Sequence, residues 1–311
     1  MRPPVCVCIP ARNEAERIGR LIEALAQQTV QSFAVAICVN NSSDVTHEKA
    51  VEATLRSNAG FAVHILQRVF EPELAHAGSA RRAAMDMGAD LLTADGLLLS
   101  TDADCRPPAD WIEANLAHFS PERIIGGRIE LDEREADEGP AIFMLRRWFD
   151  AYWQAVRAIE DRIDPVAWDM PPRHGDHTGA SIGLSVDLYR RAGGVPLLPA
   201  GEDRALVDAA IKAGGKLVHP NAVWTRASSR TTGRANGGMA ADMRRWIECA
   251  ASGDIPLVPA FSHWEERARW RLRTRARMGV AGCIEAERVL PPMPCDMPLP
   301  KVAEAEMAAV S

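Results

Sequence analysis

The amino-acid sequence predicts an α/β protein built on a mostly parallel sheet that is flanked by helices. In the first 120 residues, short apolar runs alternate with segments that have the periodicity of amphipathic helices. Polar clusters at residues 10–14, 40–44 and 101–105 each follow one of these runs. Parallel strands bring their carboxyl ends to one edge of a sheet, where open α/β sheets bind ligands. The clusters therefore predict one site of nucleotide size.

The first half of the chain shows four strands and the helices between them. The strands are expected at residues 5–9, 34–39, 61–66 and 97–99. Ile18, Leu21, Ile22 and Leu25 have the i, i+3, i+4, i+7 spacing of a helix that buries one face. Further helices are expected up to about residue 57 and over residues 75–88. Nearly continuous apolar runs are typical of strands in a parallel sheet that is covered on both faces.

The second half of the chain has a less regular pattern. An expected strand at residues 124–131 contains Gly126-Gly127, which predicts a bulge or a close backbone approach within it. An aromatic stripe over residues 142–156 predicts a helix that packs against the sheet. The remaining elements are a loop at residues 161–178, a short strand at 179–186, a helix through 206–211 and a strand at 216–219.

Composition limits the class of protein. The 311 residues suffice for one large domain, or two ordinary ones, with a sizeable core. The formal net charge of −6 argues against a nucleic-acid binder, which normally has a basic face. The seven cysteines lack the spacing of a disulfide framework, so we expect a reducing compartment, with Cys6 and Cys8 buried on one face of a strand. No signal peptide or membrane-spanning run is expected, and a cytoplasmic location is predicted.

Asp102 and Asp104 come directly after the apolar run at residues 97–99. They therefore belong at the carboxyl end of a strand, and Pro107-Pro108 opens the next helix. Two carboxylates at that position suit Mg²⁺ or Mn²⁺ held together with a substrate phosphate. Taken alone, the pair is explained more simply as a strand-to-helix turn, in which Asp is a common cap.

Glu202 and Asp203 stand at the expected amino end of a helix. The helix dipole stabilises an ionised carboxylate there, which suits a base that removes a proton from a hydroxyl group. The same dipole also favours acidic residues that have only a structural role. Arg230 and Arg234 fall in a loop at residues 225–238, where guanidinium and backbone N–H groups would bind phosphate. A solvated basic loop is the alternative.

A cluster of charged and imidazole side chains occupies residues 173–177. His174 and His177 have a His-x-x-His spacing, but no helix aligns them as a metal site would require. A mobile loop beside an acceptor substrate is favoured, with His174, Asp176 and His177 as candidate acceptor-binding residues.

Several short fragments follow one another in a specific order between residues 5 and 238. They are Ile9-Pro-Ala-Arg-Asn-Glu14, Val39-Asn-Asn-Ser-Ser-Asp44, Ser79-Ala-Arg-Arg-Ala-Ala84, Thr101-Asp-Ala-Asp104, Arg191-Ala-Gly-Gly-Val195, Gly201-Glu-Asp-Arg-Ala-Leu206 and Ser228-Ser-Arg-Thr-Thr-Gly-Arg234. In this order and spacing the fragments resemble an inverting glycosyltransferase of family 2, which has the Rossmann-like GT-A fold. The resemblance implies a GT-A domain over residues 1–238, with a nucleotide-binding half to about residue 120 and an acceptor half beyond it.

The resemblance also implies a reaction and the residues that perform it. A divalent cation, Mn²⁺ or Mg²⁺, would assist a single displacement that moves a sugar from a nucleoside-diphosphate sugar to an acceptor hydroxyl with inversion. By this resemblance, Pro10, Arg12 and Glu14 would bind the base and ribose of the donor, and Asn40 would recognise the base. Asp102 would contact the ribose side and the metal, Asp104 would bind the metal, and Arg230 and Arg234 would bind the diphosphate. Asp203 would be the general base, with Glu202 as the alternative.

Asn40 departs from the Asp that such enzymes usually hold at this position. An amide both donates and accepts hydrogen bonds, so a uridine donor does not follow from the resemblance. The acceptor stays open among lipid-linked, saccharide and small-molecule hydroxyls. Neither fold nor family chooses among them.

Residues beyond 238 lie outside the resemblance. We expect a helical extension over residues 239–290 and a proline-rich, disordered tail over 291–311. Six arginines alternate with other residues from Arg267 to Arg277. Positions two apart differ by about 200° around a helix, so these charges spread around it. A solvated or homo-oligomer-forming helix is favoured, and the alternative is peripheral contact with the inner face of a membrane.

Two other functions compete with glycosyl transfer. A nucleotidyltransferase that makes a nucleotide sugar would carry a glycine-rich, basic loop after the first strand, and residues 10–14 contain no glycine. A non-catalytic nucleotide-sugar-binding protein is supported only by Asn40.

Overall fold

The computed structural model describes residues 2–57, 60–135, 140–232 and 238–310. The chain divides into two compact units, each built from two separate segments. The first unit contains Met1–Asp132 and Asp176–Ser228, and the second contains Glu133–Gly175 and Ser229–Ser311. The chain therefore passes between the units three times. The predicted boundary at residue 238 does not separate them, because residues 133–175 belong to the second unit.

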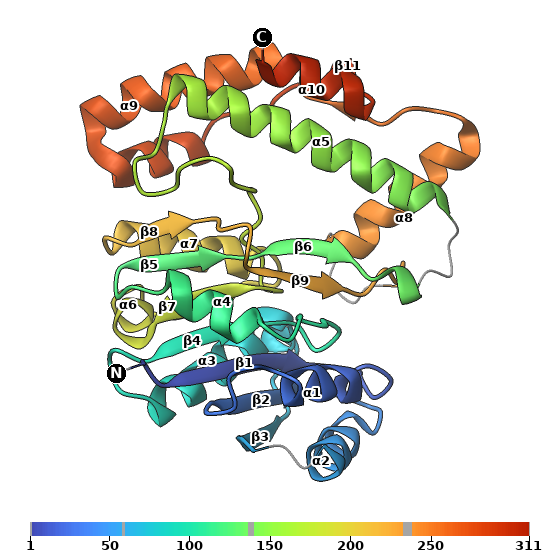
Figure 1. The fold of residues 1–311 in the computed structure, drawn as a ribbon, viewed down its shortest axis with the longest axis vertical. Helices are drawn as coiled ribbons and strands as arrows, with labels where there is room; N and C mark the ends of the chain where they lie inside the picture. Colours follow the sequence, from blue (N-terminus) through green and yellow to red (C-terminus); the bar gives the residue numbers. More distant parts are fainter. Residues whose placement is uncertain (1, 58–59, 136–139, 233–237, 311) are drawn as a thin grey trace. The chain divides into compact units, whose positions relative to one another are not determined.

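The first unit is organised by a sheet whose strands lie in the order β3-β2-β1-β4-β7-β5-β8 (Figure 1). Its strands are β1 (Val5–Ala11), β2 (Ala34–Asn40), β3 (Ala62–Arg68), β4 (Leu97–Ser100), β5 (Arg123–Gly126), β7 (Ile182–Ser185) and β8 (Lys216–Val218). Strand β7 runs antiparallel to both of its neighbours, and the other pairs are parallel. The predicted mostly parallel α/β sheet is confirmed.

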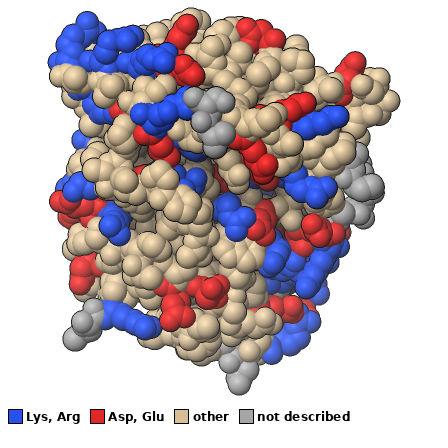
Figure 2. Space-filling view, turned by 45° about the horizontal axis from the view of Figure 1, so that its top comes forward, with Lys and Arg blue, Asp and Glu red and all other residues tan. Residues whose placement is uncertain are grey.

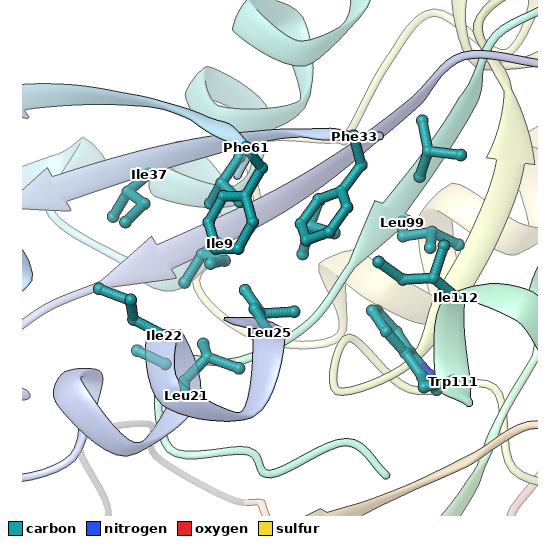
Figure 3. Close-up of a cluster of buried hydrophobic side chains, with 14 of the residues drawn as sticks. Ile9, Leu21, Ile22, Leu25, Phe33, Ile37, Phe61, Leu99, Trp111 and Ile112 are labelled. Atoms are coloured by element: carbon teal, nitrogen blue, oxygen red, sulfur yellow. The ribbon is translucent and has the colours of Figure 1, made fainter. Parts of the chain in front are cut away.

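Helices cover both faces of this sheet because its central strands are apolar on both faces. The helices of the first unit are α1 (Ile18–Ala26), α2 (Thr46–Arg56), α3 (Ala77–Leu91), α4 (Trp111–His118), α6 (Val186–Arg191) and α7 (Glu202–Lys212), with a short 3-10 turn, η1 (Pro72–Leu74). On one face, Ile9 packs with Leu21, Leu25 and Trp111 (Figure 3). On the other face lie Cys6 and Cys8 with residues of α3, α6 and α7, as predicted for the two thiols.

The predicted strand at residues 124–131 is wrong in one respect, because the chain changes sheets at its two glycines. Strand β5 ends at Gly126, and β6 (Arg128–Leu131) pairs instead with β9 (Trp224–Ala227) in a separate two-stranded sheet. A Cβ atom at Gly126 would collide with the carbonyl oxygen of Asp176, and one at Gly127 would collide with the Ser181 hydroxyl. The expected close backbone approach is therefore present at both glycines.

The second unit is mainly helical. Its helices are α5 (Pro140–Ile163), α8 (Met239–Ser252), α9 (Phe261–Arg288) and α10 (Val302–Val310), with a 3-10 turn, η2 (Glu133–Glu135), and a short ribbon of β10 (Leu257–Val258) and β11 (Met297–Pro298). The predicted helical extension is present. The tail expected to be disordered instead contains β11 and α10, whose Ala305 is buried against α5. No helix in the described part of the chain has the length and apolarity of a membrane span.

The aromatic stripe of α5 packs against the C-terminal segment and not against the sheet, which corrects the expectation. The Phe149 and Trp246 rings stack with their centroids 4.8 Å apart. The Tyr152 hydroxyl donates a hydrogen bond to the Pro259 carbonyl at 2.7 Å and accepts one from the Trp264 indole at 2.6 Å. The stripe therefore forms the core of the second unit.

Helix α9 is a hairpin of two helices that reverses at Gly279. Gly279 has φ 73° and ψ 179°, a conformation almost restricted to glycine. The Arg271 and Glu287 side chains form an ion pair at 2.7 Å. In a straight helix, with its rise of 1.5 Å per residue, these two positions would lie about 24 Å apart. The ion pair therefore requires the two arms to fold back on one another.

The six alternating arginines of α9 divide into an inner and an outer row. Each row has i, i+4 spacing, and the rows lie on opposite sides of the helix. The inner row is Arg267, Arg271 and Arg275. Arg267 pairs with Glu287, Arg271 pairs with both Glu160 and Glu287, and Arg275 pairs with Asp164. The outer row is Arg269, Arg273 and Arg277, all exposed. The predicted spread of charge around the helix is confirmed. The inner row contacts carboxylates of the second unit, and the outer row is exposed.

The inner row is held by charge pairing inside the unit. Burial alone would lower the pKa of Arg271, but its hydrogen bonds and the charges of Glu287 and Glu160 outweigh burial and raise that pKa. Burial likewise opposes ionisation of Glu287, yet its hydrogen bonds with Arg271 hold the pKa of Glu287 below its usual range. The guanidinium of Arg271 therefore ties both arms of the hairpin to α5.

A pair of matched substitutions tests this division of the arginines. Arg271→Met removes the cation that two partly buried carboxylates share and leaves each with one other arginine, Arg157 for Glu160 and Arg267 for Glu287, so we expect the free energy of unfolding to fall by about 2 kcal/mol. Arg273→Met removes an exposed charge and should change it by less than about 0.5 kcal/mol. Differential scanning calorimetry of both variants measures the difference. Equal shifts in the two variants would contradict the hairpin packing.

Candidate functional site

Strands β2, β1 and β4 are neighbours in the sheet, so the three predicted polar clusters meet at its carboxyl edge. The loops after β1 and β2 are joined by hydrogen bonds. The Asn13 N–H donates to the Ser42 hydroxyl at 3.0 Å, and the Glu14 N–H donates to the Thr46 hydroxyl at 2.7 Å. Asn13 accepts in turn from the Ser43 N–H at 2.8 Å. These contacts fix two of the three loops that the sequence assigns to one site.

Asn40 ends β2 and is 2% exposed. Its side-chain amide nitrogen has no hydrogen-bond partner among the described residues. A buried donor left without a partner costs about 1–3 kcal/mol, so such a group usually awaits a ligand or water. Near the same edge, Pro10 is half-buried, Glu14 is buried, and Arg12 donates to the Ala75 carbonyl at 2.8 Å. These residues fit a site for the polar edge of a small molecule.

Asp102 and Asp104 lie in the loop that follows β4. Their carboxylate oxygens and the Cys105 sulfur lie within 4.8 Å of one another. Burial and the nearby charges of Asp102 and Asp104 raise the pKa of the Cys105 thiol well above its usual range. Mg²⁺ and Mn²⁺ prefer carboxylate oxygen to sulfur, so the two carboxylates are the groups that would hold such a cation. Two hard oxygen ligands fit Mg²⁺ or Mn²⁺, as the sequence predicts.

His219, a candidate for a further metal ligand by its chemistry, is not part of that group. It closes β8, is 6% exposed, and its Nε2 lies 3.3 Å from Nδ1 of His177. In the part of the chain that the structure describes, the carboxylate group contains no histidine.

Arg81, on α3, is the buried cation around which the site is arranged. Its side chain is 5% exposed. One terminal nitrogen donates to Asp102 at 2.9 Å, and Nε donates to Glu202 at 3.2 Å. The other terminal nitrogen donates to the Ser100 hydroxyl at 2.8 Å and to the Gly179 carbonyl at 3.0 Å. One guanidinium thus joins the ends of β4 and α7 with the loop before β7.

Asp203 is held by the same loop. Its Oδ2 accepts the Gly179 N–H at 2.8 Å, and its Oδ1 accepts the Arg204 N–H at 2.7 Å. A Cβ atom at Gly179 would collide with the guanidinium of Arg81, so this close approach requires glycine. Asp203 and Asp102 are therefore tied to one another through Gly179 and Arg81.

The charges around Arg81 explain how a buried guanidinium is tolerated. Burial alone would lower its pKa, but the negative charges of Asp102, Glu202 and Asp203 outweigh burial and raise it. The Arg81 side chain therefore stays protonated, and it offsets part of the repulsion among three carboxylates.

The sequence interpretation assigned no role to Arg81, although the signal is present. Arg81 stands at the first position of an i, i+3, i+4, i+7 stripe that continues with Ala84, Met85 and Gly88, all buried. An arginine within an apolar stripe needs internal partners, since a buried charge is stable only when paired. The neighbouring Arg82, by contrast, is 37% exposed.

The predicted acceptor cluster is divided by the boundary between the units. His174 belongs to the second unit, whereas Asp176 and His177 belong to the first. Asp176 accepts the Ile129 N–H at 2.9 Å, and His177 contacts His219. Of the predicted diphosphate-binding arginines, Arg230 lies in the second unit, and Arg234 lies outside the described residues.

Replacing Arg81 tests whether one cation organises the site. Arg81→Met leaves Asp102 and Glu202 unpaired, so we expect the free energy of unfolding to fall by about 3 kcal/mol. Arg82→Met is the matched control and should lower it by less than about 0.5 kcal/mol. Adding Glu202→Gln to Arg81→Met should recover part of the loss, because it removes one unpaired charge. Chemical denaturation gives the free energy of unfolding of the wild type, the two single variants and the double variant. A double variant less stable than Arg81→Met alone would contradict the charge pairing.

Comparison with known proteins gives a consistent set of matches. A sequence model of glycosyl transferase family 2 matches residues 6–169. Glycosyltransferase AglE of Haloferax volcanii is 28% identical over 132 residues, which are 41% of this chain and 40% of that protein. This chain therefore aligns with less than half the length of that relative.

Two solved structures resemble the fold. The mannosyltransferase PcManGT from Pyrobaculum calidifontis, in complex with GDP-Man and Mn²⁺, has a TM-score of 0.52 at 18% identity over 93% of this chain and 79% of its own. Residues 1–349 of S. aureus TarS in complex with UDP have a TM-score of 0.50 at 15% identity over 88% of this chain and 71% of that chain. At these identities the likeness concerns the fold, and it agrees with the predicted GT-A architecture.

Proposed function

The chain belongs to glycosyl transferase family 2, and we propose that it moves a sugar from a nucleoside-diphosphate sugar to an acceptor hydroxyl by a single displacement with inversion. Membership of this family supports glycosyl transfer over the nucleotidyltransferase and non-catalytic alternatives. The observation that carries the proposal is that Asp102 and Glu202, the neighbour of Asp203, share one buried partner, Arg81.

The donor side of the site comprises the loops after β1, β2 and β4. PcManGT and TarS, which share the fold, bind GDP-Man and UDP, and this supports a nucleoside-diphosphate donor here. The unpaired amide of Asn40 would donate to a carbonyl oxygen on the base, with Pro10, Arg12 and Glu14 beside it. Uracil and guanine both carry such a carbonyl, so Asn40 accommodates either base.

Asp102 and Asp104 would hold the divalent cation. When bound, the cation stabilises the negative charge that develops on the departing nucleoside diphosphate. The fit rests on the donor set, two carboxylates close together at the carboxyl end of β4. Arg81 fixes Asp102 through its other contacts, so one of the two carboxylates is oriented before a ligand arrives.

Asp203 would be the general base that removes the acceptor proton. The N–H groups of Gly179 and Arg204 bind both of its oxygens, and Asp203 lies in the first turn of α7. Attack by the deprotonating hydroxyl on the anomeric carbon, opposite the leaving group, inverts the configuration without a covalent intermediate. Glu202 is engaged by Arg81 and 8% exposed, so it is better suited to positioning than to proton transfer.

The acceptor is a hydroxyl group of a lipid-linked, saccharide or small molecule. Asp176 and His177 remain candidates to border it, since they precede the loop residue Gly179 that binds Asp203. The roles of His174, Arg230 and Arg234 stay predictions from the sequence.

Ligand-induced stabilisation tests the donor site. The protein is heated with UDP, GDP, dTDP or CMP, each with and without Mn²⁺ or Mg²⁺. A ligand present at one hundred times its Kd adds about 2.7 kcal/mol to the free energy of unfolding, which gives a clear shift in melting temperature. We expect one nucleotide to stabilise the protein only with metal, and Asp104→Ala to abolish that effect. Stabilisation that Asp104→Ala leaves intact would contradict the metal assignment.

Substitution of the base separates binding from chemistry. Asp203→Asn preserves the size of the side chain but removes the base, so turnover should fall by about 10³-fold. Donor stabilisation in the melting assay should persist. With water as the acceptor, release of nucleoside diphosphate from the donor sugar measures turnover.

The stereochemistry of the same reaction is a second readout. Proton NMR of the freshly released sugar should show the anomer opposite to that of the donor. Retained configuration would contradict single displacement, and full activity of Asp203→Asn would contradict the assignment of the base.

A further inference from the structure

The reversal of α9 presents a basic and apolar surface that the proposed reaction does not use. We call this surface the hairpin tip and define it by Leu272, Arg273, Arg277, Met278 and Val280. All five residues lie within eight positions of Gly279, where the chain turns back. The tip therefore consists of the end of one helical arm and the start of the next.

The two arginines of the tip have no carboxylate partner among the residues that the structure describes. Arg269, one turn further from the reversal, pairs with Glu265 at 3.0 Å. Within the described residues, no carboxylate lies within 4.0 Å of the Arg273 or Arg277 guanidinium, whereas the inner row is fully paired. Figure 2 shows Lys and Arg side chains gathered in the region of the second unit that contains α9. The tip is thus a local positive patch on a chain whose formal net charge is −6.

The apolar residues of the tip are exposed beside these arginines. Leu272 is 44% exposed, Met278 is 50% exposed and Val280 is 40% exposed. Leu272 precedes Arg273, and Met278 follows Arg277, so each charge has an apolar neighbour. Ala276, Gly279 and Ala281 are also exposed, so small, uncharged residues lie among the larger side chains of the tip.

This combination distinguishes a lipid surface from a soluble anion. A soluble anion would be bound by converging guanidinium groups, and it gains nothing from an exposed Leu, Met or Val. An anionic bilayer satisfies both features, because its headgroups pair with arginines and its interface accepts short apolar side chains. We propose that the hairpin tip docks the protein on the surface of a membrane that contains anionic phospholipid.

The docking would be peripheral and reversible. The apolar side chains of the tip reach only the boundary between headgroups and acyl chains, and few arginines contribute electrostatic attraction. The remainder of this acidic chain is repelled by the same surface, which favours contact through the tip. Screening by salt should therefore release the protein, since the attraction acts over about 10 Å at 0.1 M salt. The proposal is independent of the donor, the metal and the base proposed above.

Vesicle sedimentation of the full chain tests the proposal. Vesicles of phosphatidylcholine alone are compared with vesicles in which about a third of the lipid is phosphatidylglycerol. We expect binding only to the second kind, and release at high salt. Arg273→Gln with Arg277→Gln should weaken the partition coefficient by about fivefold for each arginine removed. Met278→Ser with Val280→Ser should weaken it by a similar factor at unchanged charge.

The control removes the same charge elsewhere. Lys49→Gln with Arg56→Gln, both exposed on α2 of the first unit, should leave vesicle binding unchanged. Melting temperatures of all variants check that each protein is folded. Equal weakening by the α2 and tip variants would overturn the proposal, as would equal binding to both kinds of vesicle. Self-association lost on substitution of the tip, without any vesicle binding, would assign the surface to a second copy of the chain.

Discussion

A single buried guanidinium holds together the parts of the first unit that form the candidate site. Arg81 reaches Asp102 at the end of β4, Glu202 at the start of α7, and the Gly179 carbonyl before β7. These three positions are far apart in the sequence. The pairing of β4 with β7 brings the first and the third near one another, and Arg81 connects both of them to the start of α7. Because a buried charge is destabilising unless it is paired, each of these contacts helps to stabilise the guanidinium. Arg81 thereby positions Asp102 directly, and it acts on Asp203 only through Gly179, whose N–H binds that carboxylate.

Glycines make this arrangement possible at the points where two backbones approach closely. Gly179 lets the loop before β7 lie directly against the Arg81 guanidinium, while its N–H binds Asp203. Gly126 and Gly127 allow the same segment to pass beside the end of β5, where the chain leaves the main sheet. The antiparallel strand β7 lies between β4 and β5, so its entry loop reaches the carboxyl edge of the parallel strands. Backbone approach and charge pairing therefore reinforce one another at one edge of the sheet.

Much of the fold could be predicted from periodicity, because apolar spacing reports which face of an element is buried. It does not report which element covers that face. The stripe of α5 is buried, as its spacing predicts, yet Tyr152 and Phe149 pack on residues more than ninety positions later. Gly279 and Gly127 gave no sign of a reversal or a change of sheet, since both depend on long-range contacts. In the candidate site, Asp102, Asp104 and Asp203 follow motifs, whereas Arg81 appears only when its apolar stripe is considered with its charge.

The interleaving of the two units also sets the order in which the chain can be completed during synthesis. The sheet of the first unit needs nothing beyond residue 228, so its last strand, β8, is available early. Helix α5 is made long before its partners α8, α9 and α10, and until then Leu145, Tyr152 and Val156 have no core to join. Folding on the ribosome generally proceeds from the amino terminus. Until its C-terminal helices are synthesised, the second unit therefore exposes the aromatic stripe of α5. A chaperone that binds exposed apolar segments would bind this helix.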